Sequence, residues 1–96
     1  MSSTETTNNM FKDVWLAHKE SWLENLERYQ KIKNEMANKF ETDISYFENE
    51  HNWKQMQVIE NDILICNMQI TICDNQIKIA ELKQDNLKLK VGINDS

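Results

Sequence analysis

Large apolar residues recur every seven positions in the second half of the chain. Written in sevens from Ile63, the sequence reads ILICNMQ, ITICDNQ, IKIAELK and QDNLKLK. Branched residues alternate with others inside each repeat, as in a half-buried strand, but a strand gives no reason for a repeat of seven. A helix explains both patterns, because residues three and four apart share one helical face. The pattern therefore predicts a heptad-repeat helix over residues 54–91.

Two apolar stripes run along this predicted helix when Met56 is taken as heptad position a. Positions a and d form the stripe that we call the seam: Met56, Ile59, Ile63, Cys66, Ile70, Cys73, Ile77, Ala80, Gln84 and Leu87. Positions c and f form the stripe that we call the outer stripe: Val58, Ile65, Met68, Ile72, Ile79, Leu82 and Leu89. The positions between them are almost all polar, so each stripe needs its own cover and the outer stripe is a predicted docking surface for a partner. Gln84 is polar at position a, where such a residue can fix the register of a coiled coil.

The first half of the chain carries a stripe of aromatic residues. Its members are Trp15, Trp22, Tyr29, Phe40 and Phe47. Steps of seven, broken into four and three, place such residues on one face of an amphipathic helix, which we expect over residues 9–48. Lys19 and Lys33 share this face, where their stems can cover apolar surface while the ammonium groups reach water.

The register of the second helix is lost before Met56. Extending its seam backwards places only polar residues there: Thr42, Ser45, Asn49 and Asn52. We therefore expect a turn or kink at 49–53, where Asn49 or Asn52 can take the left-handed conformation that ends a helix. The pattern is compatible with a helical hairpin, which we favour, and with one long bent coiled-coil helix. The expected fold is thus all-α and elongated, completing a multi-helix bundle with partner chains.

A hairpin that turns near residue 50 predicts which residues face one another. Trp22 is then expected beside Ile77 and Ala80, and Tyr29 beside Ile70 and Cys73, so that large side chains meet small ones. Trp53 lies beside the turn and outside both stripes, which makes it a candidate anchor for a partner.

Composition supports long helices and a small core. The chain has 96 residues, no Pro and one Gly, so it makes one domain at most and lacks the usual signals for turns. Residues 1–8 are polar and predicted to form a disordered tail, and 92–96 form a C-terminal tail.

Charge and hydropathy exclude several classes of function. The net charge is −5 and the chain has one Arg, so we expect no direct binding to nucleic acid. The N-terminus lacks the features of a signal peptide, and no apolar run approaches the roughly 20 residues of a membrane span. The polar faces are acidic and rich in amides, unlike those of helices that lie on membranes. We therefore expect an intracellular protein, cytoplasmic or nuclear, without membrane insertion.

No set of residues indicates catalysis or a bound metal or cofactor. Cys66 and Cys73 are seven residues apart, too far for a disulfide within a straight helix, and we interpret them as small buried side chains. Glu48 and His51 form a single Glu-x-x-His unit, whereas di-iron bundles use two such units. We expect a protein that is not an enzyme.

The heptad positions bear on the kind of partner. A parallel homodimer through the seam would bring Lys83 beside Lys88, and small residues occupy three d positions where Leu is usual in dimers. We therefore expect a scaffold or interaction subunit of a hetero-oligomeric complex, with other helical proteins as partners. The alternatives are a homodimeric bundle that binds a ligand or metal, and an adaptor that inserts one helix into a groove of its partner.

Overall fold

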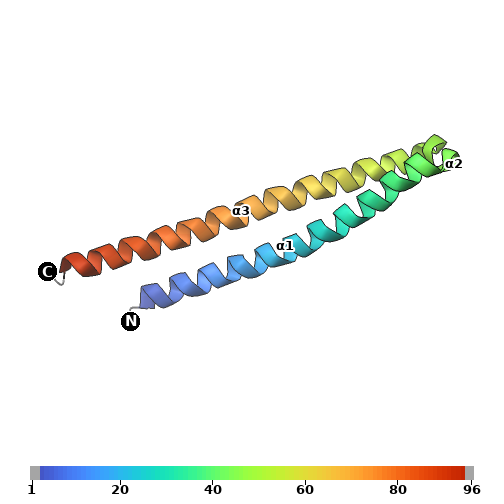
Figure 1. The fold of residues 1–96 in the computed structure, drawn as a ribbon. Helices are drawn as coiled ribbons and strands as arrows, with labels where there is room; N and C mark the ends of the chain where they lie inside the picture. Colours follow the sequence, from blue (N-terminus) through green and yellow to red (C-terminus); the bar gives the residue numbers. More distant parts are fainter. Residues whose placement is uncertain (1–2, 95–96) are drawn as a thin grey trace.

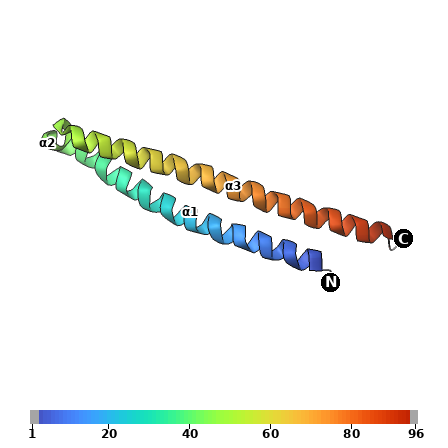
Figure 2. The same cartoon turned by 180° about the vertical axis from the view of Figure 1, so that it is seen from behind.

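The computed structural model is a helical hairpin (Figure 1), and it describes the backbone of residues 3–94 and the side chains of 7–90. The helices are α1 (Ser3–Thr42), α2 (Ile44–Glu48) and α3 (Glu50–Asn94). The long helices α1 and α3 run antiparallel and side by side, and the short α2 closes one end, as both views show (Figure 2). The molecule measures 74 Å by 16 Å by 16 Å. The expected elongated all-α hairpin is confirmed, and the bent continuous helix is not formed.

Both long helices differ from their expected bounds: α1 begins and ends about six residues before 9–48, and α3 extends beyond 54–91 at both ends. The backbone is helical from Ser3, where we expected a tail over residues 1–8. Asn8 explains part of this difference, because its Nδ2 donates hydrogen bonds to the backbone oxygen of Ala80 at 2.7 Å and to Oε1 of Gln84 at 3.3 Å. Helix α3 also passes through Gly92, since one glycine costs a helix only about 1 kcal/mol. Residues 1–2 and 95–96 of the expected tails lie outside the described residues.

The turn lies earlier than residues 49–53. Asp43 ends α1 and caps α2, accepting hydrogen bonds from the Tyr46 backbone N–H at 3.2 Å and the Ser45 hydroxyl at 3.0 Å. The hydrogen bond from Ser45 has the larger effect and that from Tyr46 the next, and both lower the pKa of Asp43 below its usual value. Asn49 then separates α2 from α3 with φ −80° and ψ 109°, which is extended backbone and not the left-handed conformation that we expected. Its side chain instead accepts a hydrogen bond from the backbone N–H of His51 at 3.0 Å, which caps α3.

Three ion pairs between the long helices define their register. They are Lys12 with Glu81 at 3.2 Å, Lys19 with Asp74 at 2.6 Å and Lys33 with Glu60 at 3.8 Å. In each of the three pairs, the midpoint of the two residue numbers lies between 46 and 47, which is the centre of the hairpin. The expected centre near residue 50 is therefore wrong, and every partner on α3 is displaced by one heptad from its expected position.

The corrected register keeps the match of large with small side chains. At this register Trp22 lies near Ile70 and Cys73, Tyr29 near Ile63 and Cys66, and Trp15 near Ile77 and Ala80, one heptad from the expected pairing. The buried apolar residues among 7–90 are Met56, Cys66, Cys73 and Ala80, all of which belong to the seam. The core is thus one narrow row of small side chains beneath half-buried aromatic ones.

Candidate interaction surface

The outer stripe of α3 is exposed along its whole length. Its seven side chains leave between 41% (Ile72) and 64% (Leu89) of their surface uncovered. Helix α1 packs on the seam, which lies on another face of α3, so no other helix of the described chain covers the outer stripe. At 1.5 Å per residue, the stripe from Val58 to Leu89 is about 46 Å long. A long, narrow apolar surface of this kind is typical of an interaction site.

Sequence reasoning missed part of the exposed apolar surface. Leu64 is 59% exposed at heptad position b, which we had treated as polar. Five further exposed apolar residues, spread over more than one face of α1 in its N-terminal part, are together named the α1 patch here: Met10, Phe11, Val14, Leu16 and Leu23. The available signal was the presence of large apolar residues outside the aromatic stripe. The α1 patch lies toward the open end of the hairpin, away from α2 (Figure 1).

Charged side chains line the side of the hairpin where the ion pairs join α1 to α3. Lys19 and Lys33 were expected to direct their ammonium groups into water, but they reach acids at e positions of α3. Because all these side chains are at least one-third exposed, each pair contributes at most about 1 kcal/mol. The pairs therefore set the register and hold little of the stability.

Trp53 belongs to an aromatic cluster at the turn. Its ring stacks on Phe40 with centroids 4.0 Å apart and meets Phe47 edge-on at 5.3 Å. Its Nε1–H donates a hydrogen bond to the backbone oxygen of Phe47 at 2.6 Å. Phe47 lies in α2 and is exposed, so it joins this cluster instead of continuing the aromatic stripe of α1. One ring face and the N–H of Trp53 are used within the chain, and its role as a partner anchor stays a prediction.

The two cysteines and the Glu48–His51 unit are the side chains that were considered for reactivity or metal binding. Cys66 and Cys73 are free thiols buried in the seam. Burial, with a smaller effect from the carboxylate of Asp62, raises the pKa of the Cys66 thiol and so lowers its reactivity. Glu48 and His51 lie on different helices, and no group of three or more potential metal ligands occurs within the described residues.

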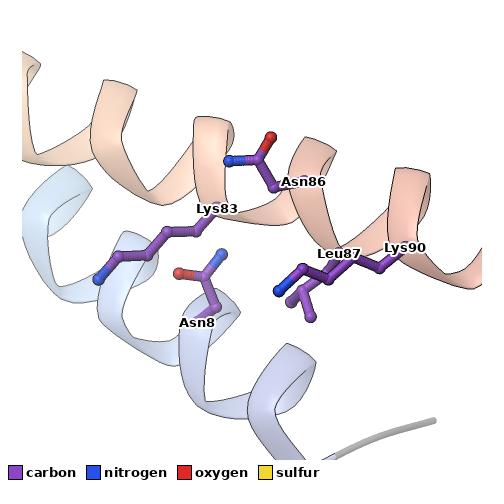
Figure 3. A pocket seen from close by; sticks show the side chains of 5 residues that line it. All are labelled: Asn8, Lys83, Asn86, Leu87 and Lys90. Carbon is purple, nitrogen blue, oxygen red and sulfur yellow. The ribbon is translucent and has the colours of Figure 1, made fainter.

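A shallow hollow of about 230 Å³ lies at the open end of the hairpin. It is lined by Asn8 from α1 and by Lys83, Asn86, Leu87 and Lys90 from α3 (Figure 3). A neighbouring hollow of about 320 Å³, lined mostly by polar and charged side chains of α1 and α3, only just reaches the roughly 300–1,000 Å³ of ordinary ligand pockets. The volume of the first hollow is below that range. Its lysines are exposed, so they offer no enclosed site for a small molecule. The outer stripe therefore remains the main candidate site.

The comparisons leave this surface to be interpreted from its own chemistry. Within the described residues, no helix is long and apolar enough to cross a membrane. No family model, no curated protein and no solved structure matches the chain.

Proposed function

We propose that the protein is a non-enzymatic coiled-coil interaction subunit that joins a larger helical assembly. It docks the outer stripe of α3 onto helices of another chain. One observation carries this proposal: the outer stripe stays exposed after α1 has covered the seam. The many exposed apolar side chains support binding to protein partners.

The energy available from covering the outer stripe is large for a chain of this size. Each half-exposed side chain contributes about 1 kcal/mol when it is covered by apolar atoms. Seven such residues together give several kcal/mol, which is comparable to the whole stability of a small domain, about 5–15 kcal/mol. Docking is therefore expected to stabilise the hairpin as well as hold the assembly together.

The structure changes the basis for choosing between partners. The sequence argument for a hetero-oligomer concerned a homodimer through the seam, and α1 of the same chain fills that seam. The hetero-oligomer therefore remains a proposal that depends on the outer stripe and the α1 patch. A bundle built around a metal or ligand has no supporting observation among the described residues. A groove-binding adaptor could offer only the outer stripe of α3, because α1 already occupies the other face.

Replacing Ile65, Ile72 and Ile79 together by Glu tests the proposed function. The triple variant should lose the proteins that co-purify with the chain from its native source, because the three carboxylates would have to be buried on docking. Its helix content by circular dichroism should remain unchanged, because these residues are exposed in the hairpin.

The matched control places three Glu residues on exposed polar positions of α1, as Gln30→Glu, Asn34→Glu and Asn38→Glu. This variant adds the same charge and should keep its partners. If the outer-stripe variant also keeps every partner, the proposed docking role is wrong.

A further inference from the structure

The charges beside the outer stripe indicate what covers it. Position g of α3 lies between the seam and the outer stripe and holds Asp62, Gln69, Gln76, Lys83 and Lys90 in that order. Neither Asp62 nor Lys83 has an ion-pair partner within residues 7–90. The edge of the stripe thus runs from an acid through two amides to a base. When a second copy runs in the opposite direction beside this edge, its base lies opposite the acid and its amides lie opposite the amides.

We propose that the outer stripe is covered by the outer stripe of a second copy, packed antiparallel about a two-fold axis near Ile72. This inference rests on the proposed function and names the occupant of its docking surface. The two-fold axis brings Asp62 beside Lys83 of the second copy and Gln69 beside Gln76 of the second copy. Each contact occurs twice, because a surface that pairs with itself about a two-fold axis repeats every contact.

The apolar residues agree with the register that the charges set. The charge contacts Asp62 with Lys83 and Gln69 with Gln76 are centred between residues 72 and 73. An apolar register centred one residue further along pairs the other members of the outer stripe with apolar partners. Its layers are Val58 with Leu89, Ile65 with Leu82, and Met68 with Ile79, each between copies, and Ile72 lies beside Asn75 of the second copy next to the axis.

A parallel second copy is less favourable on the same surface. It would bring Lys78 of one copy beside Lys83 of the other and leave Asp62 next to Gln57. Its one attractive charge contact, Asp85 with Lys90, is offset by that repulsion. The antiparallel arrangement places no like charges together along either edge of the stripe. Other proteins of a hetero-oligomeric assembly would then bind the pair of hairpins as a unit, so that they are lost when the outer stripe is disrupted.

The mass of the purified full-length chain in solution tests the inference. Sedimentation equilibrium should give twice the monomer mass of 11.5 kDa.

Asp62→Lys and Lys83→Asp should each weaken the dimer about tenfold, because each converts two attractive contacts into repulsive ones. A mixture of the two variants should recover the original affinity, since a mixed dimer places opposite charges at both contacts. Asp13→Lys makes the same charge change on the outer face of α1 and should have no effect.

The outcomes separate this inference from the proposed function. A monomeric wild-type chain overturns the second copy, while the proposed function survives if the Ile65, Ile72 and Ile79 variant still loses native partners. A dimer that is insensitive to Asp62→Lys and Lys83→Asp, or that is not rescued by mixing them, overturns the antiparallel arrangement. A dimer that also withstands glutamate at the three Ile positions overturns the second copy on the outer stripe, and the proposed function is overturned with it only if that variant keeps every native partner.

Discussion

Small residues in the seam determine how closely the two long helices approach. Cys66, Cys73 and Ala80 are almost completely buried and lie level with aromatic residues of α1. Sequence spacing alone predicted that these small residues would meet large ones, because both series repeat every seven residues. It did not predict which pairs form, since a shift by one heptad preserves the same match.

Replacing Ala80 by Trp should destabilise the hairpin strongly. Ala80 has no exposed surface, and an indole there would collide with Trp15 or force the helices apart. Overpacking of this kind costs about 1–3 kcal/mol, which corresponds to a fall of roughly 10 °C in Tm for a domain of this size. Thermal unfolding followed by circular dichroism measures the effect. Ala37→Trp is the control on the exposed surface of α1 and should leave Tm nearly unchanged; equal melting of both variants would contradict the register.

A helix could be predicted from the sequence where a residue pattern determines it. The position of the turn could not, because it depends on individual contacts. The heptad repeat predicted α3 because its period excludes a strand. The turn was misplaced because polar residues span positions 42 to 52, so the pattern allows a turn at several points. The structure selects residues 43–49 through the hydrogen bonds of Asp43 and Asn49 and the ring stack of Phe40 on Trp53. The hydrogen bond from Asn8 to Ala80 joins residues far apart in sequence, so no local pattern reveals it.

The aromatic cluster at the turn should hold the two long helices together at this end. Trp53→Ala removes the stack on Phe40 and the hydrogen bond to the Phe47 backbone, and should cost about 2 kcal/mol for a side chain that is already partly exposed. Urea unfolding provides the measurement. Trp53→Phe keeps a ring for stacking but loses the N–H donor, so its stability should fall between those of the other two proteins. A Trp53→Ala chain as stable as the wild type would show that the turn is held by other contacts.

Over residues 3–94, the molecule consists of two long helices that pack along their length and a short helix α2 that joins them at one end. Its dimensions of 74 Å by 16 Å leave no second layer of structure to cover the other faces. The outer stripe could be predicted because it follows the same heptad as the seam, whereas the α1 patch follows no repeat and was missed. The function that we propose belongs to an assembly, because the surface that the chain leaves open is the one that a second chain would complete.

Thiol labelling of an Ile72→Cys variant tests the docking role of the outer stripe most directly. Ile72 lies at the middle of the stripe and is 41% exposed, whereas the native thiols of Cys66 and Cys73 are buried and should react slowly. In the assembly isolated from its native source, the account predicts that Cys at position 72 is protected from a maleimide reagent. An Asn34→Cys control on the exposed face of α1 should be labelled rapidly. If both positions are labelled equally fast in the assembly, no chain covers the outer stripe and the account is contradicted.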